Sequence, residues 1–132
     1  MRFLLPRPDF ALVLRTDFSD DTAWETLQAT LEAEPDYGLV TFVSDPAFAG
    51  TTARQAPAVV EGVGEVFLAD AEALSGGEFA LLAVDLSTEP GRAFRVTPRA
   101  FVEVTSNFMT DNMEFASYAD VADRVGVFRG FD

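Results

Sequence analysis

Aspartates follow or end four predicted strands, where they could act together in one site. Apolar runs predict these strands at 11–16, 39–44, 65–69 and 79–86. The aspartates at their ends are Asp17, Asp45, Asp70 and Asp85. If all four strands run parallel, the carboxylates share the edge at which open α/β sheets bind ligands. Clustered carboxylates can hold a divalent ion such as Mg²⁺, or shift one another's pKa so that one serves as an acid or base.

The same aspartates also have an ordinary structural explanation. Aspartate at the start of a helix accepts hydrogen bonds from free backbone amides, and Asp45 before Pro46 is typical of an Asx turn. Helix capping, a metal or catalytic site, and a rim that docks a cationic partner are therefore three alternatives. The candidate rim residues are Asp17, Asp20, Asp21, Asp45, Asp70 and Asp85, together with Arg15 and Arg92.

Two smaller polar groups accompany the rim. Arginines at positions 15, 92, 95 and 99 could form structural salt bridges or clamp a substrate carboxylate. Asn107 and Asn112, on either side of Phe108 and Met109, could line a pocket, although a turn and a helix cap explain them equally well.

The composition removes many kinds of chemistry. The chain has no Cys and no His, and its nine basic residues are all Arg. Thiol nucleophiles, disulfides, Ser–His pairs, the usual zinc sites, Schiff bases and a phosphate-loop lysine are thus excluded. We expect a protein without enzymatic activity and without a bound cofactor, with Mg²⁺ on the acidic rim as the alternative.

The net charge of −13 limits the partners. Such a charge repels nucleic acids and anionic membranes, and it attracts basic protein surfaces or divalent ions. No apolar run reaches the roughly 20 residues of a membrane helix, and prolines at positions 6 and 8 interrupt the start of the chain before a secretory segment could form. We expect a cytoplasmic protein, either a monomer or a homodimer.

The predicted elements are organised around residues 12–31. A buried strand, the acidic turn at 19–21 and a helix over 20–34 make the first half of a βα unit. A short helix is predicted at 70–74, the strand at 79–86 is the most apolar and belongs at the sheet centre, and 93–97 returns as its antiparallel partner. The pattern predicts an α/β fold, with α+β as the alternative: a mixed, partly parallel sheet covered by helices.

The remaining segments complete a single domain over 1–132, with 1–10 as a lead-in. Pro98 can open a helical turn, and the β-branched and aromatic residues after it favour a strand within 98–109. A last helix is predicted at 113–124, capped by Asp111 or Asn112, followed by a short edge strand at 127–128. The interval 47–64 is the least regular part of the chain.

Several segments carry a family resemblance. They are LVLRTDFSDDTAW, FVSDPAFAG, LLAVDLSTEPGRAFRV, NMEFASYAD and GVFRGF. Together they resemble an uncharacterised family of small proteins from high-GC bacteria, with a departure at residues 55–64. The resemblance implies a single small domain and shared polar elements, but no activity. These elements are Asp17, Asp20, Asp21, Asp45, Glu89, Gly91 and Arg92.

Two functions agree with these observations. The first is an interaction or regulatory module, such as an immunity protein, that binds a basic surface of another protein. The alternative is a small-molecule-binding protein, or a carboxylate- or Mg²⁺-dependent enzyme of a biosynthetic pathway, that uses the acidic rim. An apolar pocket with perturbed carboxylates would favour the alternative, and a solvated acidic face would favour the module.

Overall fold

A computed structural model describes residues 3–4, 11–34, 40–109 and 113–130. The helices are α1 Asp21–Glu32, α2 Ala56–Val59, α3 Ala71–Ser75, α4 Pro98–Met109 and α5 Phe115–Val125, with a 3₁₀ turn η1 at Pro46–Phe48. The strands are β1 Phe3–Leu4, β2 Ala11–Arg15, β3 Val40–Val43, β4 Val60–Glu61, β5 Glu65–Ala69, β6 Leu81–Asp85, β7 Ala93–Val96 and β8 Val127–Phe128.

The main sheet is mixed, which confirms the predicted α/β fold. Its described strands lie in the order β3-β2-β5-β6-β7-β8. Strand β2 pairs in parallel with β3 and β5, whereas β6 is antiparallel to both of its neighbours, β5 and β7. The short β8 pairs in parallel with β7 at the edge, as predicted. Strand β6 is therefore internal, and among the described strands of this sheet it is the one that runs opposite to the rest.

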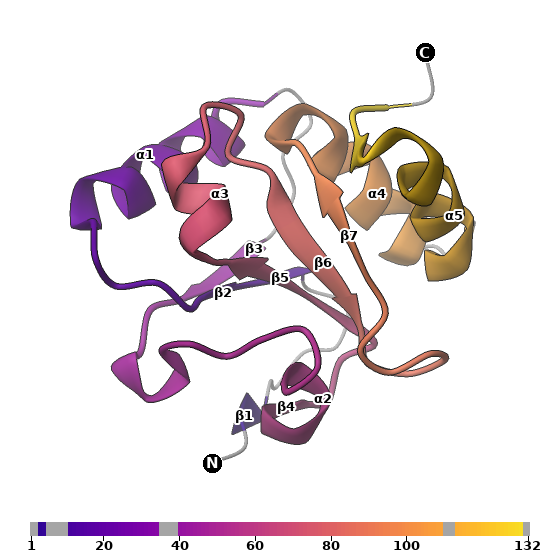
Figure 1. The fold of residues 1–132 in the computed structure, drawn as a ribbon, viewed down its shortest axis with the longest axis horizontal. Coiled ribbons are helices and arrows are strands. Elements are labelled where there is room, and N and C mark those ends of the chain that lie inside the picture. Colours follow the sequence, from indigo (N-terminus) through magenta and orange to yellow (C-terminus); the bar gives the residue numbers. More distant parts are fainter. Residues whose placement is uncertain (1–2, 5–10, 35–39, 110–112, 131–132) are drawn as a thin grey trace.

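The sheet has a helical layer on one face and an irregular layer on the other (Figure 1). Because side chains alternate along a strand, Val13 and Phe67 point to the face covered by α1, α3, α4 and α5. Leu12 and Leu68 point to the opposite face, which packs against η1, α2 and β4. The two apolar layers leave both faces of the central strands buried.

Helix α1 follows from its sequence. The Asp20 side chain accepts from the Ala23 amide at 3.0 Å and so caps the helix. Trp24, Leu27 and Leu31, at helical spacing, are buried on its inner face, and Trp24 is only 6% exposed. The predicted helix over 20–34 is confirmed, with ends one to two residues inside the predicted ones.

The prediction of a strand within 98–109 is wrong, because this segment forms helix α4. The Thr97 hydroxyl accepts from the Ala100 amide at 3.4 Å, and the Thr97 carbonyl accepts from the Phe101 amide at 2.9 Å. Phe101 and Val104 then share the buried side, and the Phe101 ring lies 4.8 Å from that of Phe67. Burial at helical spacing outweighs the weak β propensity of these residues.

The C-terminal helix is confirmed at Phe115–Val125, but its cap differs from the prediction. Glu114 occupies the N-cap position without a side-chain capping hydrogen bond. The proposed capping residues, Asp111 and Asn112, lie outside the described residues. Within the part of the chain that the structure describes, no helix has both the length and the apolar character needed to cross a membrane.

Candidate functional site

Three of the four strand-end aspartates share one edge of the sheet. Asp17, Asp45 and Asp70 follow β2, β3 and β5, which run parallel, so they come after the carboxyl ends of those strands. Asp85 is at the opposite edge, because β6 is antiparallel and pairs Asp85 with Glu65 at the start of β5. The prediction that all four aspartates meet at one edge is therefore wrong for Asp85.

Three aspartates near the carboxyl edge, Asp20, Asp45 and Asp70, accept hydrogen bonds from backbone amides, as the capping alternative predicted. Asp20 caps α1, Asp45 caps η1 and Asp70 caps α3. Asp45 accepts from Ala47 at 2.9 Å, and Asp70 accepts from Ala73 at 3.1 Å. Each carboxylate thus has a structural role of its own.

Asp70 also forms a two-bond ion pair with Arg95. The distances from the guanidinium nitrogens to the two carboxylate oxygens are 2.7 and 2.8 Å. Burial raises the pKa of Asp70, but the hydrogen bonds from Arg95 and Ala73 and the positive charge of Arg95 outweigh it, so the pKa lies below its ordinary value. For Arg95, burial lowers the pKa, but the hydrogen bond and the charge of Asp70 and the charge of Glu72 together outweigh it, so the pKa is raised. This pair links the start of α3 to β7.

Arg15 is almost completely buried beside the α1 N-terminus, with 4% of its surface exposed. It donates to the Asp17 carbonyl at 2.8 Å and to the Asp21 carboxylate at 2.7 Å. Its guanidinium carbon lies 4.5 Å from the ring centre of Phe18 and 5.6 Å from that of Trp24. Arg15 therefore fixes the turn between β2 and α1, and its donors point to protein atoms.

The acidic residues of this edge do not assemble a metal site. Among the described residues, no three acidic side chains are arranged to hold a metal ion. Asp17 accepts from the Ser19 hydroxyl at 2.9 Å, and the other carboxylates are engaged separately.

A cavity of about 470 Å³ does open at this edge between β2 and β5. The chain leaves β2 through α1 to β3 on one side, then crosses the opposite face through η1 and α2 to β5 on the other side (Figure 1). The cavity lies on the face of the sheet opposite α1 and α3, because Leu68 and Leu82 line it together with residues 50–53. Thr16, Asp17, Asp70 and Arg95 are among the residues that line it.

At the opposite edge, the buried Asp85 organises the loop after β6. Its side chain, in a residue 3% exposed, accepts from the amides of Ser87 at 3.0 Å, Thr88 at 3.2 Å and Glu89 at 2.8 Å. Gly91, with φ +96°, donates its amide to the Asp85 carbonyl at 2.8 Å and adopts the turn predicted for Pro90-Gly91.

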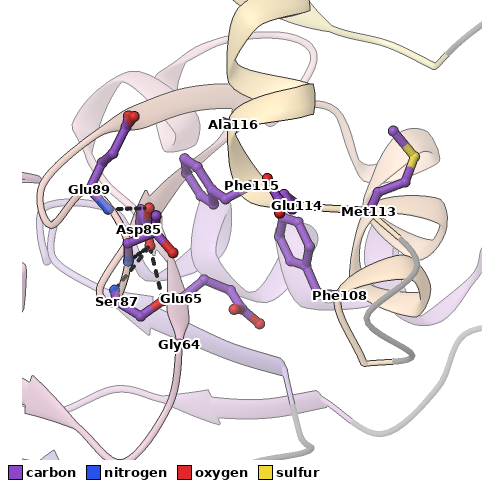
Figure 2. A pocket seen from close by; sticks show the side chains of 11 residues that line it. Gly64, Glu65, Asp85, Ser87, Glu89, Phe108, Met113, Glu114, Phe115 and Ala116 are labelled. Carbon is purple, nitrogen blue, oxygen red and sulfur yellow. Dashed lines mark hydrogen bonds between the residues drawn. The ribbon is translucent and has the colours of Figure 1, made fainter.

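Next to this loop lies a groove of about 380 Å³, which we call the acidic groove (Figure 2). Its described lining comes from the start of β5, the loop after β6, the end of α4 and the start of α5. The residues are Gly64, Glu65, Asp85, Ser87, Thr88, Glu89, Phe108, Met113, Glu114, Phe115 and Ala116. Four carboxylates and three large apolar side chains thus line one groove, and no basic residue is among the described lining residues.

The acidic surface continues from the groove onto α5. The exposed Asp120 and Asp123 accept from Arg92 at 2.5 and 3.1 Å, and Glu89 accepts from the same guanidinium at 3.1 Å. The pKa of Arg92 is raised, mainly by the hydrogen bond to Asp120. Burial lowers this pKa, and the hydrogen bonds to Asp123 and Glu89 raise it further. Arg92 therefore ties the loop to α5, while three carboxylates surround one cation.

Most residues of the acidic groove were not predicted as site residues. The sequence predicts Asp85 at the other edge, and it indicates Phe115 only as part of the last helix. The sequence indicates that Asn107 and Asn112 could line a pocket. The residue between them that lines the groove is Phe108, whereas Asn107 donates to the Tyr118 hydroxyl at 2.6 Å and Asn112 lies outside the described residues. The signal that could have indicated the groove is the helical spacing within 98–109. A helix over these residues ends at Met109, which brings Phe108 close in sequence to the start of the next helix.

Comparison with known proteins agrees with the resemblance found in the sequence. A search of curated proteins finds no match to the chain. The family described as "Domain of unknown function (DUF6924)" matches residues 10–131, which is nearly the whole chain. The chain therefore belongs to this family of domains of unknown function.

Proposed function

We propose that this protein is an interaction module that binds a basic surface of another protein through its acidic groove and the adjoining face of α5. The observation that carries the proposal is the lining of the groove by Glu65, Asp85, Glu89 and Glu114 around apolar side chains. Protein interfaces combine an apolar centre with a polar rim in this way. Asp120 and Asp123 extend the negative surface along α5.

The charge of the whole chain supports the same proposal. A net charge of −13 steers cationic partners towards the protein and makes their association sensitive to salt. Asp45 and Asp70 at the other edge favour this function over metal-dependent catalysis, because they already accept backbone amides, and Asp70 also binds Arg95. A regulatory or immunity protein that covers a basic surface would use such a module.

A second candidate function is favoured by the cavity between β2 and β5. It lies at the carboxyl edge of parallel strands, where open α/β sheets bind ligands, and Asp17, Asp70 and Arg95 supply polar groups. Thermal melts in the presence of small amines and polyols test this function. A rise in melting temperature that Thr16→Val abolishes would place a small ligand there.

The binding of a basic partner is tested by affinity purification from the source organism with two charge-matched variants. Glu114→Gln/Asp123→Asn removes two negative charges from the proposed surface. Glu25→Gln/Glu32→Gln removes two exposed charges from α1, so it serves as the control. Both variants make the net charge less negative by the same amount, so any difference between them reports the position of the charges.

We expect a basic protein to be purified with the wild type and with the α1 variant, and to be reduced with the groove variant. Its retention should fall as NaCl is raised, because exposed charge pairs are screened by salt. Equal loss from both variants would indicate an attraction without a defined surface. Failure to enrich any basic protein would contradict the proposed function.

A further inference from the structure

We propose that the cavity between β2 and β5 binds a small alkylamine, whose charged amino group donates to the Thr16 hydroxyl and the Asp17 carboxylate. This inference rests on the second candidate function, the binding of a small molecule in this cavity, and it names the class of ligand. The volume of about 470 Å³ lies within the range of about 300–1,000 Å³ for small-molecule pockets. The cavity is therefore large enough for a small organic ion.

The observation that points to a ligand is the buried hydroxyl of Thr16. Thr16 is 5% exposed, and its side chain has no hydrogen-bond partner among the described residues. Every described side-chain oxygen or nitrogen that is closed off from solvent does have a partner, so the Thr16 hydroxyl retains access to the cavity that this residue lines. A hydroxyl that folding removes from bulk water without a protein partner is stabilised when a ligand supplies the missing hydrogen bond.

The backbone of Thr16 holds this hydroxyl in place. Its amide donates to the Ala69 carbonyl at 3.0 Å, and its carbonyl accepts from the Gly50 amide at 2.8 Å. These two bonds join the end of β2 to the end of β5 and to residues 50–53, which form one wall of the cavity. The hydroxyl is thus fixed relative to the walls, and a site that is formed in advance binds its ligand at a smaller entropic cost.

The charged groups of the cavity favour a cation. The lining contains three carboxylates and one guanidinium, which are those of Asp17, Asp70, Glu72 and Arg95. Arg95 is already engaged, because both of its terminal nitrogens bind Asp70 and its Nε lies 3.4 Å from Glu72. Asp17 accepts from the Ser19 hydroxyl at 2.9 Å and forms no ion pair with a described residue. An ammonium group can therefore donate to Asp17 and Thr16 together, whereas an anion would find no free cation.

The apolar side chains of the cavity account for the alkyl part of the ligand. Leu68 of β5 and Leu82 of β6 line it from the sheet, and Ala53 lines it from the facing loop. All three belong to the apolar layer between the sheet and the segment that contains η1 and α2. A short hydrocarbon chain gains free energy by leaving water for such a surface. A polyol has no such chain, so an alkylamine fits this lining better.

The amine site is tested on the full chain with three probes of similar shape and different charge: n-butylammonium, 1-butanol and butyrate. Binding is followed by two-dimensional NMR of the backbone amides and the leucine methyl groups. The amides of Thr16 and Gly50 and the methyl groups of Leu68 and Leu82 should shift together. We expect n-butylammonium to bind about tenfold more tightly than 1-butanol, because hydrogen bonds from a charged donor are stronger, and butyrate to cause no shifts.

Two substitutions with matched controls locate the amino group. Thr16→Val keeps the shape of the side chain and should weaken n-butylammonium about tenfold, because it removes a hydrogen bond to a charged group. It should not destabilise the free protein, since the hydroxyl has no described partner, and urea unfolding checks this. Thr22→Val, at an exposed position of α1, should leave the affinity unchanged. Asp17→Asn should weaken n-butylammonium and not 1-butanol, whereas Asp45→Asn, which removes an exposed charge outside the lining, should affect neither.

The possible failures are distinguishable from one another. If n-butylammonium and 1-butanol bind in the cavity equally well, the amine site is wrong and the binding of a small molecule there stands. If none of the three probes shifts the resonances of the cavity, both the amine site and the second candidate function are contradicted, and the interaction module is unaffected. Shifts by n-butylammonium that are confined to the acidic groove and α5 would show attraction by surface charge alone, and they would also overturn the proposal.

Discussion

Replacement of Asp85 by asparagine should destabilise the protein by about 2 kcal/mol. The Asp85 carboxylate accepts from the Ser87 and Thr88 amides through one oxygen and from the Glu89 amide through the other. In asparagine one of these oxygens becomes an NH₂ group, so at least one amide faces a donor. The remaining bonds become neutral, and a hydrogen bond to a charged group contributes about 1.5–3 kcal/mol against about 0.5–1.5 kcal/mol for a neutral one.

Two effects make the loss of stability in Asp85→Asn smaller than the full value of the hydrogen bonds. Ser87, Thr88 and Glu89 are exposed, so a released amide can bind water. The substitution also removes one of four negative charges around the acidic groove, which relieves some repulsion. The sum is about 2 kcal/mol, a substantial share of the roughly 5–15 kcal/mol that stabilises a typical domain.

Urea unfolding of the wild type, Asp85→Asn and Asp45→Asn measures this effect directly. Asp45 is the control because it is exposed and accepts from one amide, and asparagine caps such turns as well as aspartate does. Asp45→Asn should change the free energy of unfolding by less than about 0.5 kcal/mol. If Asp85→Asn changes it no more than the control does, the buried carboxylate does not organise the loop.

Three further predictions follow from other parts of the fold. Trp24→Ala should cost about 3–5 kcal/mol, because it removes a buried ring that contacts Phe42, and a denaturant midpoint that hardly moves would contradict this. The lowered pKa of Asp70 stabilises the fold above its unfolded pKa of about 3.9, and this stability is lost as the pH falls through the folded pKa. Asp70→Asn should therefore be less stable at pH 7, and the difference should shrink towards pH 3 in urea titrations; a constant difference would be inconsistent with the ion pair. MgCl₂ and NaCl of equal ionic strength should give identical thermal melts, because the strand-end aspartates are engaged separately; a rise of about 2.7 kcal/mol at 100 times the dissociation constant would instead reveal a magnesium site.

The sequence predicts well what depends on local patterns. Trp24, Leu27 and Leu31 repeat at helical spacing after the acidic cap, and α1 forms there. The apolar run around Leu81 predicts an internal strand, and β6 is internal. Asp20, Asp45 and Asp70 precede helices or turns and cap them. In each case the signal and the structure lie within a few residues of one another.

The errors arise where distant segments decide the outcome. The direction of β6 depends on its pairing with β5 and β7, and this direction moved Asp85 to the other edge of the sheet. Phe101 and Val104 suit a strand by type, but their common burial against the sheet makes a helix. The acidic groove combines four segments that are separate in sequence, so no single motif could indicate it.

The short strand β8 makes the fold depend on the order in which the chain is synthesised. Strand β7 lies between β6 and β8, and β8 appears only after both α4 and α5 have been made. The buried Phe128 ring lies 5.0 Å from that of Tyr118 and 6.5 Å from that of Phe94. Until residues 127–128 leave the ribosome, β7 has an unpaired edge and these rings lack one neighbour. The β7 side of the sheet is therefore completed last during translation, and until then its edge is open to pairing with other chains.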